Sequence, residues 1–227
     1  EAQGGMGFGA VEAMVVMEEL GRGLVNAPFA HAALVAPALL AAAPQELQAQ
    51  WLPKIADASA LIVLAHQERR ARYRLNHVTT RATKNAQGWT LGGEKSVVPA
   101  GDEADAFIVP ARLSGADDAS NGIGLFLVEK NAVQVRGYPT QDGARAAEVK
   151  LSNAGAALIA DKGFAALEAA VDTGIAALCA EGVGAMDKLL AMTVEYMNTR
   201  KQFGVPIASF QALRHRVADM KMQLELA

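Results

Sequence analysis

Residues 199–211, TRKQFGVPIASFQ, gather side chains that can bind a nucleotide. The guanidinium of Arg200 offers two parallel N–H donors to a phosphate, and the amides of Gln202 and Gln211 can add hydrogen bonds. Phe203 would contribute an aromatic wall for a flat heterocycle. These residue types favour a site for the pyrophosphate and base of a nucleotide.

The same stretch also has a purely structural interpretation, as the corner of a helix hairpin. Gly204 suits the end of one helix, Pro206 blocks its continuation, and Ser209 can cap the next helix. Cations are favourable near a helix C-terminus, and they would be solvated while Phe203 and Phe210 pack the corner. Spacing alone leaves both interpretations open.

Other residue types that often carry chemistry are isolated in this sequence. Cys179 is the single cysteine, which excludes a disulfide or a cysteine zinc cluster within the chain. Its apolar surroundings predict a small core residue. No metal-ligand spacing joins the four histidines, which are His31, His66, His77 and His215. We therefore expect no metal site.

The composition is that of a globular protein with a proper core. Of 227 residues, 52% are hydrophobic and 20% are charged, which is not the composition of a disordered chain. The net charge of -3 argues against general affinity for nucleic acid. No apolar run can span a bilayer and no secretory signal is visible, so we expect a cytoplasmic protein without nucleic-acid or membrane partners. The glycine-rich start EAQGGMGFG and the uncapped helical end lead us to expect missing natural sequence at both ends.

Hydrophobic spacing divides the chain into three regions that must position these side chains. Residues 1–60 are helical: AVEAMVVMEELGRG has a helical period and ends at Gly21 and Gly23, and Pro44 begins a helix through QELQAQWLPKI. Residues 61–161 carry about seven short strands without a helix, which predicts a small antiparallel barrel or sandwich. Within WTLGGEKSVV, the Gly-Gly pair predicts a hairpin turn between two strands.

Residues 162–227 return to a helical period. Apolar residues recur every three or four positions from Leu167 to Leu189, which predicts one face of a single long helix. After the GVP turn they step by 3, 4, 3 and 4 from Phe210 to Leu224, as in a bundle seam. Two such helices expose more apolar surface than they can cover between themselves. We therefore expect partner helices, from a missing C-terminal part, from another subunit, or from both.

Several segments resemble the acyl-CoA dehydrogenase family, in the same order along the chain. YMNTRKQFGVPIASFQALRHRVADM is similar to the family's Arg-x-x-Phe-Gly-x-x-Ile, Phe-Gln and Ala-Asp-Met pattern. EAQGGMGFGAVEAMVVMEELGR resembles its Gly-Gly-x-Gly loop and the following helix, and WTLGGEKSVVPAGDEADAFIVPAR resembles its central strand pair. The resemblance implies an α+β multidomain fold: an N-terminal helical domain (1–60), an antiparallel β-barrel (61–161) and the first two helices of a C-terminal four-helix bundle (162–227).

The resemblance also implies a cofactor and partners. FAD would bind between barrel and bundle, with the corner of one subunit reaching the FAD of its neighbour. Arg200, Gln202 and Phe203 match the family residues that touch the FAD phosphates and adenine side, and Gln211 matches a glutamine close by. The substrate would be an acyl-CoA of fatty acid metabolism and β-oxidation, the electron acceptor an electron-transferring flavoprotein, and the assembly a homo- or hetero-oligomer, either a dimer or a tetramer.

Residues 65–76, AHQERRARYRLN, depart from the family pattern Thr-Glu-Pro-x-Ala-Gly-Ser-Asp. Gln67 falls where the threonine would be and can still bond the flavin pyrimidine edge. Arginines replace the glycine-serine part, and on a functional interpretation Arg72 and Tyr73 would meet the CoA phosphates or a carboxylate at the far end of an acyl chain. On a structural interpretation ERRARYR is a solvated basic loop, and the sequence leaves both open.

A second departure lies where the family has a Trp-Ile-Thr/Ser-type tripeptide against the flavin. Alignment through Lys95 and Gly101 puts Val97, Val98 and Pro99 there. Proline has neither a hydroxyl nor a backbone N–H, so a hydrogen bond to flavin N5 would be lost and Val98 would supply only packing. The pattern resembles a divergent branch of the family, including small subunits of two-component acyl-CoA dehydrogenases such as that for pimeloyl-CoA.

The sequence assigns no catalytic residue. The resemblance implies a glutamate base that usually lies beyond residue 227, and the alternative family position falls at residues 173–175, none of which is a base. Glu181 is better explained as a hydrogen-bonded or surface residue.

Two hypotheses follow from the resemblance. The chain is an FAD-dependent acyl-CoA dehydrogenase that forms the α,β double bond of an acyl-CoA, or it is a non-catalytic structural subunit of a heteromeric acyl-CoA dehydrogenase. In the second case Arg200 and Gln202 would complete the FAD site of the partner. A flavin-dependent oxygenase on the same scaffold is a third option.

Overall fold

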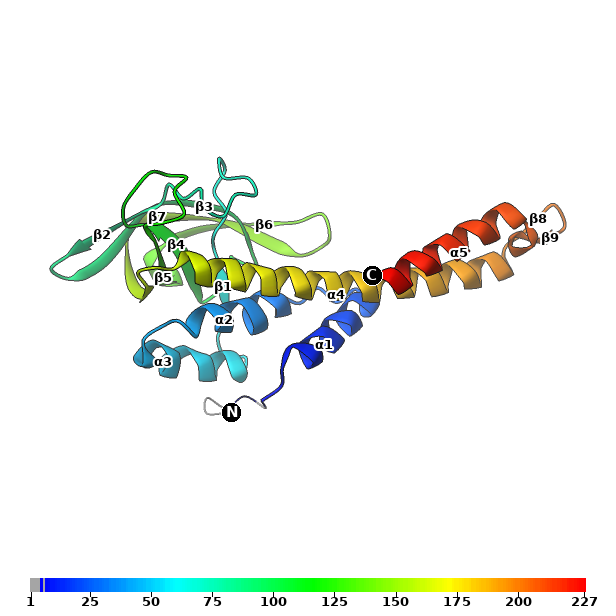
Figure 1. Cartoon of the computed structure of the whole chain (residues 1–227), viewed down its shortest axis with the longest axis horizontal. Helices are drawn as coiled ribbons and strands as arrows, with labels where there is room; N and C mark the ends of the chain where they lie inside the picture. The colour runs from blue at the N-terminus through cyan, green and yellow to red at the C-terminus, as the bar shows by residue number, and fades with distance from the viewer. Residues whose placement is uncertain (1–4, 6) are drawn as a thin grey trace. The chain divides into compact units, whose positions relative to one another are not determined.

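The computed structural model describes residue 5 and residues 7–227 (Figure 1). The predicted glycine-rich loop at the start of the chain lies largely outside these residues. The described chain forms two compact units, one of residues 5, 7–8 and 27–175 and one of residues 9–26 and 176–227. The order of helices, strands and helices confirms the predicted fold class, while the predicted domain limits stay a prediction.

Short helical segments precede the strands of the first unit. The π-helical segment η1 (Ala30–Val35) runs directly into α2 (Ala36–Leu40), and α3 (Gln45–Ala56) follows. Pro44 stands at the N-cap of α3, as predicted, because its fixed φ is compatible with a helix start. The helices share one apolar core with the strands and with the start of α4, and this core includes Leu39, Leu40, Trp51, Ile62, Ile108 and Leu167.

Seven strands form the sheet: β1 (Ile62–Leu64), β2 (Arg81–Asn85), β3 (Gly88–Pro99), β4 (Ala106–Arg112), β5 (Ile123–Glu129), β6 (Gln134–Pro139) and β7 (Arg145–Ala160). A short 3-10 turn, η2 (Lys130–Ala132), joins β5 to β6. Strands β4, β2, β3, β7 and β5 pair in that order, and β5 pairs again with β4, so these strands close into a barrel. The pairings are antiparallel except for β1 with β4 and a single bridge between β2 and β4.

The central strands are buried on both faces. Every residue of β4 is buried, because alternate side chains enter two different cores. Ile108 packs toward the helices, whereas Phe107 and Val109 pack inside the barrel with Phe126. The strand run AFIVPAR is therefore almost continuously apolar, since it has no solvent side.

The predicted hairpin turn at Gly92 and Gly93 is wrong. Both glycines lie inside the single strand β3, and the turn comes earlier, where Asn85 pairs with Gly88 across two residues. Gly93 has φ +152, and a Cβ there would lie 2.6 Å from Thr80 Oγ1. The glycine is needed for a close approach of chain segments, not for a turn.

Helices build the second unit. It contains α1 (Ala10–Gly23), the later part of α4 (Phe164–Thr199) and α5 (Gln211–Leu226). As predicted, α1 ends at Gly23. The hairpin of β8 (Lys201–Gln202) and β9 (Val205–Pro206) joins α4 to α5 through η3 (Ile207–Ser209), as Figure 1 shows at one end of the two helices.

Two glycines bring α1 and α4 into backbone contact. A Cβ at Gly21 would lie 1.9 Å from the carbonyl oxygen of Glu181, and a Cβ at Gly184 would lie 1.8 Å from that of Glu18. Each helix therefore packs a glycine directly against the main chain of the other, a spacing that any side chain would prevent.

The apolar faces of α4 and α5 confirm the predicted seam and correct the expectation for Cys179. Leu213, Val217, Met220 and Leu224 are the half-buried residues of α5, as the seam predicts. Cys179 is exposed rather than a core residue; the buried residues of α4 are Leu167, Ala170, Ala177, Ala180, Gly184, Leu190 and Met197. Much of the apolar face predicted between Leu167 and Leu189 is uncovered, with Ile175, Leu178, Met186 and Leu189 exposed.

The start of α5 differs from the predicted cap. The N-cap residue is Phe210, which makes no side-chain cap hydrogen bond. The Ser209 hydroxyl instead donates to the carbonyl oxygen of Pro206, at 2.8 Å, because the intervening 3-10 turn brings it there.

Among the described residues, no helix combines the length and the apolar character that a bilayer crossing requires.

Candidate functional site

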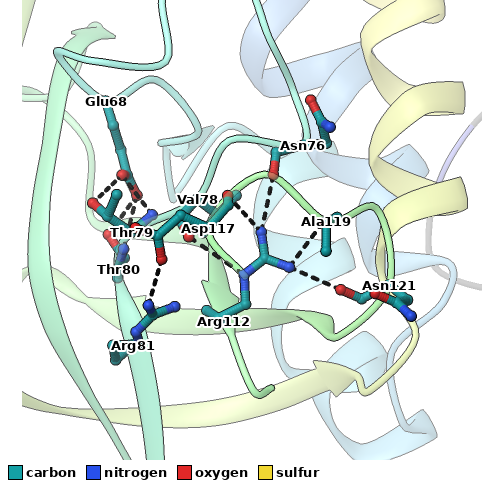
Figure 2. Close-up of polar contacts among 10 residues, drawn as sticks. All are labelled: Glu68, Asn76, Val78, Thr79, Thr80, Arg81, Arg112, Asp117, Ala119 and Asn121. Atoms are coloured by element: carbon teal, nitrogen blue, oxygen red, sulfur yellow. Dashed lines mark hydrogen bonds and ion pairs between the residues drawn. The ribbon is translucent and has the colours of Figure 1, made fainter. Parts of the chain in front are cut away.

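The loop that follows β1 is anchored by the buried carboxylate of Glu68 (Figure 2). Its Oε1 accepts hydrogen bonds from the Thr80 backbone N–H at 3.0 Å, the Thr80 hydroxyl at 2.7 Å and Lys95 Nζ at 2.8 Å. Its Oε2 accepts from the backbone N–H, at 2.7 Å, and the hydroxyl of Thr79. A buried ion pair with all these donors in place fixes the loop to β3 and to the segment before β2.

Electrostatics keep this pair charged. Burial alone would raise the pKa of Glu68, but attraction to Lys95 and the hydrogen bonds from Lys95 and Thr79 lower it to about 2. Burial lowers the pKa of Lys95, and Glu68 opposes that effect. The carboxylate is therefore ionised at neutral pH and fully engaged, so it is not free to act as a base.

His66 precedes this anchor and is neutral. Burial, followed by the charges of Lys95 and His31, lowers its pKa from 6.5 to about 4. Burial disfavours the charged imidazolium most, and the nearby buried ammonium of Lys95 adds to the same effect on the pKa of His66.

A cavity of about 580 Å³ lies beside the anchor. It is lined by Gln67, Glu68, Arg69, Arg72, Tyr73, Ser96, Val97 and Glu148. The Ser96 backbone N–H donates to the carbonyl oxygen of Gln67 at 2.9 Å, which joins the loop to β3. Three residues singled out from the sequence, Gln67, Arg72 and Tyr73, thus share one cavity.

Val98, singled out as flavin packing, lies elsewhere. It is 1% exposed, pairs with Ala147 of β7 and belongs to the barrel core. The neighbouring Val97, which is 49% exposed, is the valine that lines the cavity.

The arginine-rich part of the loop is exposed between its two ends. Tyr73 is 95% exposed, and Arg72 is exposed with φ +53. Arg69 comes within 3.9 Å of Glu148 Oε2, an ion pair longer than a hydrogen bond. The exposed guanidinium groups are therefore available to an anionic ligand.

Arg112, the last residue of β4, fixes the far end of the loop (Figure 2). It is 2% exposed. Its guanidinium donates only to main-chain carbonyl oxygens, those of Asn76 (2.9 Å), Val78 (3.4 Å), Asp117 (2.8 Å), Ala119 (2.8 Å) and Asn121 (2.8 Å). Burial lowers its pKa, but a guanidinium stays protonated in proteins. The arginine-rich segment is thus held at one end by Glu68 and at the other by Arg112.

The second group of predicted site residues lies in the other unit, around the β8–β9 hairpin. Arg200 and Gln202 are exposed, and Gln202 Nε2 donates to the carbonyl oxygen of Lys201 at 2.8 Å. Phe203 is 92% exposed with φ +53, and its ring meets Phe210 edge to face at 6.0 Å. The hairpin brings these side chains to one corner, as both sequence interpretations require.

Gln211 completes this group as the first residue of α5, where it is exposed. Glu181 is half-buried, and its carbonyl oxygen faces Gly21 in the helix crossing. Nothing in these contacts gives Glu181 the role of a base, and no catalytic residue is assigned.

Sequence reasoning missed the groups that hold the site together. The pairing of Glu68 with Lys95 spans 27 positions and that of Arg112 with Asn76 spans 36. Neither pairing can be predicted from the spacing of residues along the chain. For Arg112 the available clue was a charged residue at the end of an otherwise apolar strand, because such residues are rarely buried without partners.

Three family models match successive parts of the chain. They are described as the acyl-CoA dehydrogenase N-terminal domain (residues 1–59), middle domain (63–154) and C-terminal domain (161–227).

Curated proteins give the same family. Acyl-CoA dehydrogenase IpdE2 of Mycobacterium tuberculosis is 33% identical to this chain, over 100% of the chain and 57% of its own length. Probable acyl-CoA dehydrogenase FadE25 of the same organism is 30% identical, over 100% of the chain and 61% of its own length. The chain thus spans about three fifths of the length of these relatives.

Among solved structures, that of a steroid ACAD variant matches with a TM-score of 0.83 and 31% identity, over 99% of this chain and 60% of its own. The sequence similarity and the fold therefore point to one family.

Proposed function

Because the chain belongs to the acyl-CoA dehydrogenase family, we propose that it acts in an FAD-dependent acyl-CoA dehydrogenase that forms an α,β double bond in an acyl-CoA thioester. The observation that supports this most is the single cavity shared by Gln67, Arg72 and Tyr73. Gln67 falls where the family resemblance expects a flavin contact, Arg72 and Tyr73 replace the family pattern beside it, and all three come from a loop held at both ends.

The donor set of this chain fits FAD. Gln67 carries an amide that both donates and accepts, which suits the pyrimidine edge of a flavin, and Val97 adds apolar surface. Glu148 Oε2 is buried and accepts no hydrogen bond from the described residues, although Arg69 lies 3.9 Å from it, so a ligand could also donate to it. We assign the diphosphate to Arg200 and Gln202 of a neighbouring subunit, whose exposed donors suit it. When bound, FAD would supply the hydride acceptor.

The acyl-CoA is assigned to the arginine-rich side of the cavity. The exposed guanidinium of Arg72 can hold a phosphate of CoA or a carboxylate at the far end of the acyl chain, and Tyr73 offers a ring and a hydroxyl. Glu68 and Arg112 hold the two ends of the loop. Binding of the acyl-CoA therefore carries a smaller entropic cost for ordering the loop.

The proposal includes partners. An electron-transferring flavoprotein would take the electrons, and the protein would be an oligomer in which the corner with Arg200 and Phe203 meets the FAD of a neighbouring subunit. The exposed apolar residues of α4 support the oligomer, because such faces mark interaction surfaces.

A second candidate is a non-catalytic subunit of a heteromeric acyl-CoA dehydrogenase. Pro99 favours it, since this residue offers neither a hydroxyl nor an N–H at the position where the family resemblance expects a partner for flavin N5. In that case the chain would contribute Arg200 and Gln202 to the FAD site of its partner.

Flavin content and reduction distinguish the two candidates. The purified protein should be yellow, and its visible absorbance should bleach when acyl-CoA is added without oxygen. Arg200→Gln should lower the bound FAD, while the control Arg216→Gln, on the exposed side of α5, should retain it. A colourless protein that becomes yellow only with a partner subunit would favour the second candidate, and no flavin in either form would refute both.

A further inference from the structure

The cavity beside the Glu68 anchor has a second carboxylate in its wall, that of Glu148 in β7. Its side chain is only 13% exposed. The Tyr138 hydroxyl donates to Oε1 at 3.3 Å, which is long for a hydrogen bond to a carboxylate. Oε2 accepts no hydrogen bond from the described residues, and Arg69 Nη2 lies 3.9 Å from it. Glu148 is thus mostly withdrawn from water with little in exchange.

The two carboxylates of the cavity differ in how fully they are hydrogen-bonded. Glu68 accepts hydrogen bonds at both oxygens, from Thr79, Thr80 and Lys95. A largely buried carboxylate without comparable donors is costly. An N–H or O–H group of a ligand would supply the missing donor of Glu148 at Oε2.

The side chain of Arg69 controls access to this oxygen. Arg69 lines the same cavity, so Oε2 of Glu148 lies toward the cavity side of the strand. The Arg69 side chain is 71% exposed, and an exposed ion pair of this length contributes little. Arg69 can therefore turn into solvent, and a ligand can take its place at Oε2.

Strand register brings Glu148 close to Gln67. A bulge in β3 places Ser96 and Val97 together opposite Glu148. The Ser96 backbone N–H donates to the carbonyl oxygen of Gln67 at 2.9 Å. Ser96 thus connects Gln67 to the strand position that faces Glu148, and all four residues line the cavity.

We infer that Glu148 is a flavin-binding residue, whose Oε2 accepts a hydrogen bond from the imide N–H of the flavin beside the amide of Gln67. This rests on the proposed function, in which Gln67 meets the pyrimidine edge. That edge carries one N–H between two carbonyl oxygens. A carboxylate, which only accepts, matches the N–H, and the amide of Gln67 can donate to a neighbouring oxygen.

A carboxylate at this edge also tunes the flavin. Reduction adds negative charge to the ring system, and a nearby negative charge opposes it. Glu148→Gln keeps the shape of the side chain and removes the charge. It should raise the reduction potential of bound FAD, measured by equilibration with a reference dye. A purely structural carboxylate would alter stability without moving the potential.

The affinity for FAD should change in the same variant. The dissociation constant of Glu148→Gln should rise about fivefold, the difference between a hydrogen bond to a charged acceptor and one to a neutral acceptor. Glu94→Gln, the same chemical change at an exposed position of β3, is the matched control and should alter neither the affinity nor the potential.

The wild-type protein supplies a test that needs no variant to fold. 3-Methyl-FAD lacks the imide N–H and should bind at least about tenfold more weakly than FAD, and this preference should be smaller in Glu148→Gln. Equal affinity of the wild type for the two flavins would overturn the inference. So would an unchanged potential in Glu148→Gln. A protein that binds neither flavin, alone or with a partner subunit, would instead refute the proposed function, and the inference with it.

Discussion

His66 and Glu68, close together in the loop after β1, bind protons differently in the folded and unfolded chain. The pKa of His66 is about 4 in the fold against 6.5 in the unfolded chain, so the unfolded chain binds the extra proton between these values and stability falls as pH falls through them. The pKa of Glu68 is lowered to about 2 from 4.5. Its contribution is complete above about 4.5 and is lost as the pH falls through about 2.

We predict that His66→Asn flattens the loss of stability between pH 6.5 and 4 and leaves the lower window, which belongs to Glu68. The free energy of unfolding would be measured by urea denaturation across the pH range. His215→Asn, at an exposed position of α5, is the matched control and should preserve the slope. An unchanged slope in His66→Asn would show that His66 is not the titrating group.

At the arginine-rich loop, we predict that Arg72→Glu weakens acyl-CoA binding at least about tenfold, because a favourable contact with an anion becomes a repulsive one. Isothermal titration calorimetry with an acyl-CoA would measure it. Lys162→Glu makes the same change of charge at an exposed residue between β7 and α4 and should leave the affinity unaltered. Equal affinities for both variants would mean that the loop is only a solvated basic segment.

Among the elements, α1 and α4 depend on their glycine crossing. A methyl group at Gly184 would penetrate the main chain of Glu18, and main chain in a helix cannot move aside as a side chain can. At Gly182, in the same helix, a methyl group would have nothing within 4 Å. The two positions therefore differ in the space around them.

We therefore predict that Gly184→Ala lowers the free energy of unfolding by about 1–3 kcal/mol, the usual range for overpacking. Gly182→Ala should raise it by about 0.5–1 kcal/mol, because alanine is the better helix former. Urea denaturation monitored by circular dichroism would measure both. A stabilised Gly184→Ala variant would contradict the helix crossing described here.

The sequence predicted those elements whose signals are local. The long helix α4, the seam of α5 and the start of α3 after Pro44 follow from spacing and from proline geometry. The Gly-Gly pair was misread because local rules associate it with turns, whereas Gly93 is required by the approach of Thr80 from the segment before β2. Cys179 was misassigned because periodicity identifies an apolar face but not what covers it.

The site was predictable only in part, for the same reason. The loop residues Gln67, Arg72 and Tyr73 are neighbours in sequence, so the cavity that they share could be anticipated. Arg112 acts through hydrogen bonds to a loop that is distant in sequence. A single sequence carries no direct signal for such contacts.

For the whole molecule, the uncovered residues of α4 matter most. Leu178 and Leu189 are 53% and 57% exposed and lie about three turns apart, so they share one side of the helix. Leaving large apolar side chains in water is costly when they are grouped. A protein with this face should associate through it.

We predict that the protein is an oligomer and that the double variant Leu178→Glu with Leu189→Glu shifts it toward monomer, because each charge would be buried unpaired in the interface. Sedimentation velocity would measure the change. Lys188→Glu, a neighbouring exposed position, should leave the oligomer intact. An unchanged oligomer in the double variant would exclude this face from the interface.

The two attachments of the arginine-rich segment differ in chemistry, and this has a consequence in acid. Glu68 loses its charge when protonated, whereas Arg112 bonds only carbonyl oxygens, which do not titrate. Lowering the pH therefore weakens the attachment of the segment at its Glu68 end first. The backbone hydrogen bond from Ser96 to Gln67 remains there, and the other end stays bound to Arg112 at Asn76.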